Sequence, residues 1–170
     1  MQAIAIRAAP RAAAEHARAR AMVRFNGLMF HALATASLLE AAAPQQAERL
    51  ARSFEAYPEV QAWLAQVWLP QRAEHGCWLR EYAQATWPEF DWSAAWDEFR
   101  SSYRPRSGLA RGRAGAALEA LSCCATAAQA AMFYRALARG ADDPQLRALA
   151  DGAARDHAGY FDHFRSVLEH

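Results

Sequence analysis

Two short stretches of the chain pair residue types that could carry out chemistry. Arg72 and His75 lie three residues apart in the first stretch, and His157 and Tyr160 have the same spacing in the second. This spacing is close to one helical turn, so both members of a pair can face the same neighbour. Imidazole groups exchange protons near neutral pH, and a guanidinium can hold an anionic group such as a carboxylate. If the protein is an enzyme, His75, His157, Tyr160 and Arg72 are therefore its candidate catalytic residues.

Four long helices are predicted to position these side chains. The helical period of the apolar positions, interrupted by breakers, predicts helices over about 10–43, 58–86, 113–139 and 143–168. Shorter helices are predicted over 44–56 and from Ser93, the expected N-cap, to Tyr103, with a loop over 104–112. Pro70 lies inside the second long helix and should kink it. The inner stripes are predicted to include Phe25, Met29, Leu33 and Leu39 in the first long helix, Gln71, His75 and Leu79 in the second, Ala127 and Tyr134 in the third, and His157 and Tyr160 in the fourth.

Composition favours one all-α domain that spans residues 1–170, with residues 1–9 extended or disordered. Alanine is abundant, all the basic residues are arginine, and 19 basic against 18 acidic residues leave no excess charge to attract nucleic acid. We see no apolar stretch near the ~20 residues that a membrane span needs, and no secretory signal, so a cytoplasmic protein of bacterial type is predicted. The three cysteines, Cys77, Cys123 and Cys124, suit buried thiols better than disulfides or zinc ligands.

Three segments, in order along the chain, resemble the ferritin-like diiron-carboxylate superfamily. Residues 68–82, which include Glu74-His75-Gly76, are similar to the second helix of small bacterial ferritin-like proteins and, more distantly, of acyl-carrier-protein desaturases. Residues 133–149 are similar to their third helix, its turn and the start of the fourth, and residues 156–164 to the ligand-bearing part of the fourth. The resemblance implies an antiparallel four-helix bundle with a long crossover between the second and third long helices.

The ligand positions of that superfamily are mostly replaced in this chain. Arg72 stands where the family has a glutamate, Ala127 where the third helix carries a carboxylate, and His157 and Tyr160 where the fourth helix has Glu and His; His75 alone is retained. On the first helix, the depth of His75 is predicted to fall between Asn26 and Leu33, where no carboxylate stands. Glu40 also faces inward but is placed nearer the helix end. A diiron centre needs bridging carboxylates, so the resemblance implies a lost site.

No metal or cofactor is therefore expected. If a metal binds, the interpretation left open is a single iron held by His75, His157 and Glu40. The polar residues at this depth otherwise form either a hydrogen-bonded layer within the core or the floor of a small-molecule pocket. Lining residues expected for such a pocket are Asn26, Gln71, Trp68 and Cys123, with apolar walls from Trp63, Trp78, Trp87, Trp92 and Trp96.

Three functions remain open from the sequence. The favoured one is a ferritin-like protein without its diiron site that acts as a metal-independent binding protein or enzyme on a small, largely apolar ligand. The second is a residual oxidoreductase with a rearranged or mononuclear iron site. The third is a structural or interaction subunit, with a possible homodimer, because retention of a fold does not dictate its function.

Overall fold

The computed structural model describes residues 10–104 and 112–169, with the side chains of residues 10–16 left aside. The predicted all-α class is confirmed, since every element in the described residues is helical. The elements are α1 (Pro10–Arg24), α2 (Gly27–Ala41), α3 (Ala43–Ser53), α4 (Pro58–Trp63), the π-helical turn η1 (Leu64–Trp68), α5 (Leu69–Thr86), α6 (Trp92–Ser102), α7 (Gly112–Gly140) and α8 (Pro144–Leu168). The predictions for residues 1–9 and for most of the loop over 104–112 lie outside the described residues.

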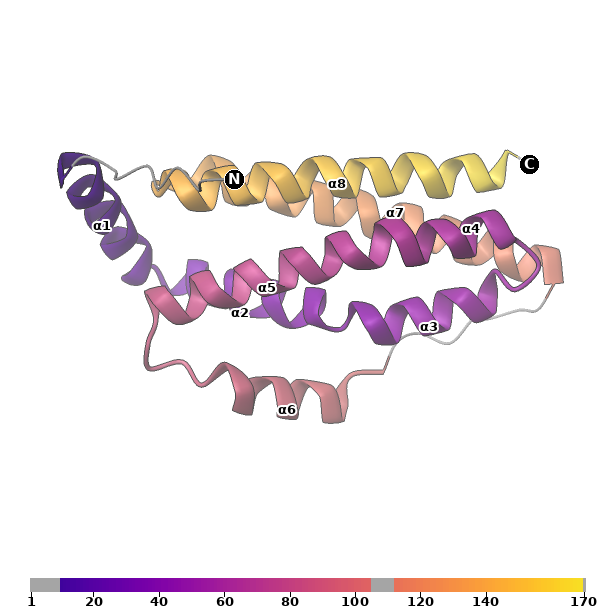
Figure 1. Cartoon of the computed structure of the whole chain (residues 1–170), viewed down its shortest axis with the longest axis horizontal. Helices are drawn as coiled ribbons and strands as arrows, with labels where there is room; N and C mark the ends of the chain where they lie inside the picture. The colour runs from indigo at the N-terminus through magenta and orange to yellow at the C-terminus, as the bar shows by residue number, and fades with distance from the viewer. Residues whose placement is uncertain (1–9, 105–111, 170) are drawn as a thin grey trace, which may run out of the picture.

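Two helical layers form the main body of the molecule. The long helices α7 and α8 pack along each other, while α2 lies along α5 and α3 lies along η1 and α5. The connection from α5 to α7 carries α6, which packs on the outer side of α2, so that α8 and α6 lie at opposite edges of the molecule (Figure 1). This arrangement brings α2, α5, α7 and α8 around one elongated core.

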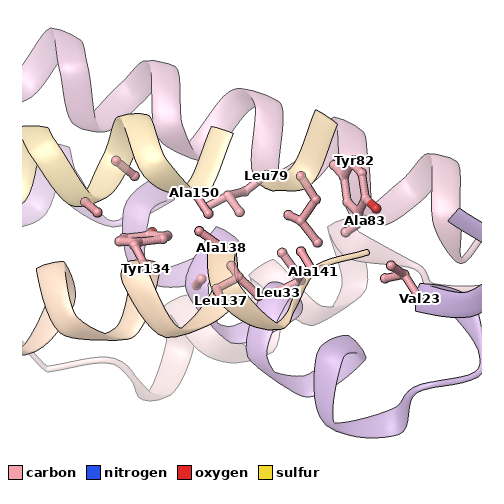
Figure 2. Packing of buried hydrophobic residues seen from close by; sticks show 14 of the residues in the cluster. Val23, Leu33, Leu79, Tyr82, Ala83, Tyr134, Leu137, Ala138, Ala141 and Ala150 are labelled. Atoms are coloured by element: carbon pink, nitrogen blue, oxygen red, sulfur yellow. The ribbon is translucent and has the colours of Figure 1, made fainter. Parts of the chain in front are cut away.

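The core consists of two apolar clusters separated by a polar layer. One cluster contains Leu33, Leu79 and Ala150 (Figure 2), and the other contains Leu64 and Phe164. The buried polar residues Glu40, Arg72, His75 and His157 fall between the two clusters along α2, α5 and α8. The sequence order therefore alternates apolar, polar and apolar on three helices, and the polar positions meet at one depth.

The first long helix does not run unbroken over 10–43. It breaks after Arg24, and the side chain of Asn26 caps α2 by accepting a hydrogen bond from the backbone N–H of Met29 at 3.2 Å. Asparagine is among the strongest N-cap residues, because its side-chain oxygen satisfies an otherwise free helical N–H. The break turns Phe25 outward, where it is 87 % exposed, and Leu39 is also exposed, so both assignments to the inner stripe are wrong.

The predicted depth of the first helix is wrong because the helical path continues past residue 43. After Ala41 the chain resumes helical geometry at Ala43, so α2 and α3 together lie opposite the stretch from α4 to α5. The midpoint of this pair falls near Glu40, not between Asn26 and Leu33. Glu40, at the end of α2, therefore lies at the depth of Arg72 and His75, near the middle of the α2–α3 pair.

The second long helix keeps the predicted bounds, from Pro58 to Thr86, and responds to Pro70 with a π-helical turn. The backbone N–H of Leu69 donates to the carbonyl of Leu64, five residues earlier. Proline lacks an N–H and disturbs the hydrogen bonds of the helix before it. π-helical turns often occur at functional sites. At the crossover, Asp91 rather than Ser93 caps α6, because its side chain accepts from the backbone N–H of Ala94 at 3.0 Å.

Among the described residues, α7 is the one helix that is long and apolar enough to cross a membrane by length and composition, and one such helix is weak evidence for a span. The core helix of a soluble protein passes the same test. Here α7 packs along α8 and contributes Ala120, Tyr134 and Leu137 to the buried clusters.

Candidate functional site

Glu40 is the centre of the polar layer. Its side chain is buried, one carboxylate oxygen accepts from the hydroxyl of Tyr134 at 2.7 Å and from Nε2 of His157 at 3.1 Å, and the other accepts from Nε of Arg72. Burial alone would raise the pKa of Glu40, but the charge of Arg72 and the hydrogen bonds from His157 and Tyr134 outweigh it and lower the pKa to about 2. Glu40 is thus a carboxylate whose charge is fully compensated inside the core.

Arg72 is fixed from several sides. Besides Glu40, its Nη2 donates to the carbonyl of Leu39 at 3.2 Å and its Nη1 to the side-chain oxygen of Gln46 at 3.4 Å. The guanidinium carbon lies 4.9 Å from the centre of the Trp68 ring, within the range of a cation–π interaction. The charge of Arg72 is therefore already paired with Glu40. From the sequence we had instead expected Arg72 to be available for an anionic ligand.

His157 stands between the polar layer and the aromatic residues of α7 and α8. Burial lowers the pKa of His157, more strongly than its bond to Glu40 raises it, so the ring is neutral and donates its Nε2 proton to Glu40. The ring stacks on Tyr134 at 5.3 Å and meets Tyr160 edge-on at 5.0 Å.

His75 forms a second pair with Asp156, a residue that the sequence reasoning missed. Nε2 of His75 lies 2.9 Å from a carboxylate oxygen of Asp156, while its buried Nδ1 meets no partner in the described chain. The rings of His75 and His157 are 5.9 Å apart, at the common depth that the helix phases predict. The Asp156 side chain is 36 % exposed, so it connects a buried imidazole with solvent. Its position beside His157 on the outer edge of the helical stripe gave no signal of this contact.

Glycine at position 76 lets α5 approach α2 where these residues meet. A Cβ atom on Gly76 would lie 3.2 Å from the backbone nitrogen of Ala41 and 3.3 Å from the carbonyl carbon of Glu40. Such distances are tighter than ordinary van der Waals contact, so a larger residue must push α2 away. The close approach places the Glu40 side chain within reach of Arg72.

One group of three possible metal ligands occurs in the described residues. Glu40, His75 and His157 each offer one ligand atom, and these atoms lie within 4.8 Å of one another. Two imidazoles and one carboxylate are the donor set of mononuclear iron oxygenases. The set fits one ion by chemistry, although Glu40 would have to exchange its bonds to Arg72, Tyr134 and His157 for a metal.

A cavity of about 470 Å³ opens between α2 and α7 and ends on the polar layer. Its inner end is formed by Glu40, Arg72, Tyr134 and His157, and its sides are mainly apolar. The side-lining residues are Ala32, Ala36, Leu39, Ala130 and Phe133, with His31, Thr35, Gln46, Thr126 and Gln129 as polar neighbours. His31 is exposed. His157 lines the cavity whereas His75 is not among the described lining residues, so of the two histidines His157 is the one that a ligand would contact.

A second cavity of about 60 Å³ lies beyond Arg72 and His157, toward α3 and the middle of α7. Trp68 and Cys123 line it, together with Tyr160, whose buried hydroxyl finds no partner among the described residues. Burial raises the pKa of Tyr160, so this hydroxyl stays protonated. Burial also raises the pKa of Cys123 to about 12, which makes an inert thiol.

The expected pocket residues are thus only partly brought together. Asn26 is wrong as a lining residue, because it is exposed and caps α2. Gln71 is half-buried and lines neither described cavity, and Trp68 and Cys123 line the smaller one. The walls of the larger cavity contain no tryptophan from the described chain; Trp92, for example, donates its Nε1 proton to Ser37 at 2.9 Å, away from the cavity.

Comparison of the chain with protein-family models, with curated proteins and with solved structures gives no match.

Proposed function

We propose that the protein binds a small, largely apolar molecule in the cavity between α2 and α7, without a metal ion. One observation carries this proposal: a cavity of about 470 Å³ with mainly apolar sides ends on a buried polar layer whose charges are already paired. Small-molecule sites commonly combine apolar walls with a few convergent polar groups, and bundle cores are one of their usual places.

The polar end of the cavity supports a specific kind of recognition. Arg72 and Glu40 neutralise each other, and His157 is neutral, so the large cavity favours an uncharged body with limited polar content. His157 is the group placed to give or take a proton at the ligand if the protein is an enzyme. His75 lies next to His157 and is not among the described lining residues of the cavity. Its contact with the half-exposed Asp156 offers a route for protons to solvent.

The ancestry that we infer is a ferritin-like four-helix bundle, formed by α2, α5, α7 and α8, that has lost its diiron site. Support comes from Arg72, whose positive charge lies where a cation would sit, and from Ala127, a small apolar residue at the expected carboxylate position of α7. A guanidinium that compensates Glu40 makes a cation at that place unnecessary. A cytoplasmic location and the lack of a nucleic-acid partner stay predictions from the sequence.

Filling the cavity tests the binding proposal. Ala130→Phe adds a ring to the side of the large cavity, whereas Ala125→Phe adds the same ring to the exposed face of the same helix. With 2-naphthol as a neutral fluorescent ligand, the wild type and Ala125→Phe should show saturable binding, and Ala130→Phe should lose it. Equal binding by all three proteins would place the ligand elsewhere and refute the proposal.

A mononuclear iron oxidoreductase is the second candidate, favoured by the proximity of Glu40, His75 and His157. These three residues would hold the ion, which would supply redox chemistry with dioxygen at the end of the cavity. Elemental analysis of protein produced with added iron separates the two candidates. We expect well under one iron per chain; one iron per chain that disappears in His75→Ala would support the second candidate and overturn the first.

A further inference from the structure

Two buried hydrogen-bond donors point to a second site, in the 60 Å³ cavity. Nε of Arg49 and the hydroxyl of Tyr160 are both buried and both lack a partner in the part of the chain that the structure describes, and both residues line this cavity. Tyr160 is 2 % exposed, so bulk water does not satisfy its hydroxyl. Buried polar groups without partners are rare and carry an energetic penalty, which a bound group can remove.

The lining of the cavity shows which kind of group fits. Its charged side chains among the described residues are Arg49 and Arg72, while their carboxylate partners Glu119 and Glu40 are not among its lining residues. An arginine N–H can only donate, so the missing partner must be an acceptor. Gln46, Ser122 and Thr126 add further polar groups to the same lining. The cavity thus presents donors and positive charge at its surface, with the negative charge behind the arginines.

We propose that this small cavity binds a carboxylate group, held by Arg49 and Tyr160 with Arg72 at its edge. The size agrees, because one water needs roughly 10–15 Å³ of such volume, so a cavity of about 60 Å³ takes about four to six non-hydrogen atoms and has room for a carboxylate group. Hydrogen bonds from a guanidinium to an anionic oxygen are about twice as strong as neutral ones, which favours a carboxylate over water.

The carboxylate has two sources. It is either a free small ion or the acidic end of the molecule in the large cavity, because the two cavities share Gln46, Arg72, Thr126 and His157. The second source rests on the proposed function, since it places the apolar body of one ligand in the large cavity and its acidic end in the small one. The first source is independent of it.

Formate tests the shared chemistry. Saturation-transfer NMR on the intact protein should show saturable formate binding to the wild type. Binding should be weakened at least about tenfold in Tyr160→Phe, which lacks the hydroxyl, and in Arg49→Lys, which lacks the Nε–H. Tyr57→Phe, which removes a hydroxyl from a residue outside the cavity lining, should bind like the wild type. Circular dichroism establishes that each variant keeps its helical content. No saturable binding, or equal binding by all four proteins, would overturn the inference.

A pair of larger ligands distinguishes the two sources. If the carboxylate belongs to the cavity ligand, 4-phenylbutyrate should displace formate and bind more tightly than 4-phenylbutanol, and Ala130→Phe should abolish its binding while formate still binds. If the ion is free, formate should bind and 4-phenylbutyrate should fail to displace it. If the wild type binds 4-phenylbutanol but does not bind formate, the carboxylate site is refuted and the proposed function still stands.

Discussion

Arg72 of α5 donates from Nε to the carboxylate of Glu40 of α2 inside the core, where both side chains are buried. Each of these charges would be strongly unfavourable alone, since an unpaired charge in the interior loses its hydration. The pair therefore joins α2 and α5 within the core, and it supplies the positive charge that a metal ion would bring to Glu40.

Removing the arginine alone should destabilise the protein strongly. In Arg72→Met the Glu40 carboxylate keeps only its neutral donors, and breaking one side of a buried pair costs about 3–5 kcal/mol. Denaturant unfolding should show this loss, whereas Arg135→Met on the exposed face of α7 should change the free energy of unfolding by less than about 0.5 kcal/mol. The double variant Glu40→Gln with Arg72→Met should recover most of the stability. A single Arg72→Met variant as stable as the wild type would show that the pair does not hold α2 to α5.

Glycine 76 should resist even the smallest substitution. Gly76→Ala brings a Cβ to 3.2 Å from the backbone of Ala41, and we expect a loss of about 1–3 kcal/mol because the backbone must move. Gly159→Ala in α8 is the matched control, since its Cβ would meet nothing within 4 Å. This control should stabilise the protein by roughly 0.5–1 kcal/mol through helix propensity. Thermal unfolding of both variants gives the comparison, and stabilisation by Gly76→Ala would contradict the close helix approach.

As the pH falls, the free energy of unfolding should decrease in two intervals, the first due to His157 and the second to Glu40. Because the pKa of His157 is lowered in the folded protein, this histidine takes up a proton at a higher pH in the unfolded chain than in the folded one. The stability that is present above the ordinary histidine pKa of 6.5 is therefore lost as the pH falls below 6.5. The pKa of Glu40, lowered from 4.5 to about 2, adds a second loss as pH falls through that interval, of order 3 kcal/mol.

Free energies of unfolding measured against pH check both assignments. His157→Gln should flatten the first step and Glu40→Gln the second. Because burial also lowers the pKa of His163, its contribution has the same sign, and His163→Gln serves as the reference for the first step. An unchanged first step in His157→Gln would mean that His163 alone accounts for it.

Much of the fold was predictable because its boundaries depend on local chemistry. Pro58 starts the second long helix and Pro144, after the cap of Asp143, starts the last one; both act through the fixed backbone of proline. The break at Asn26 was missed because the helical period of the apolar residues continues across it. The cap that the Asn26 side chain forms decides where α2 begins, and the periodicity does not show it. The depth of Glu40 was misplaced for a different reason, because α3 continues the helical path of α2 to Ser53.

The candidate site was only partly predictable for a related reason. His75 and His157 could be found because each lies on the central stripe of its helix. Asp156 was missed because contacts at the edge of a stripe depend on the rotation of two helices, which periodicity does not resolve to one residue. A pocket was expected, but the lining of the large cavity was not predicted, since it depends on the space left between α2 and α7.

The position of Glu40 at the depth of His75 can be tested by building a diiron centre there. Arg72→Glu, Ala127→Glu, His157→Glu and Tyr160→His would place carboxylates and an imidazole beside His75 and Glu40, and the first helix already supplies its ligand. We expect this variant to bind two irons per chain, measured by elemental analysis and Mössbauer spectroscopy. Adding Glu40→Gln to the four substitutions should reduce the iron content. Iron binding that is indifferent to Glu40→Gln would contradict the assigned depth of Glu40.

The affinity for 2-naphthol before and after removal of metal tests the central claim most directly. We predict the same dissociation constant of 2-naphthol for protein treated with a chelator and for protein supplied with ferrous iron. Ala130→Phe should lose 2-naphthol binding under both conditions. Binding that disappears after chelation and returns with one iron per chain would contradict a metal-independent site between α2 and α7.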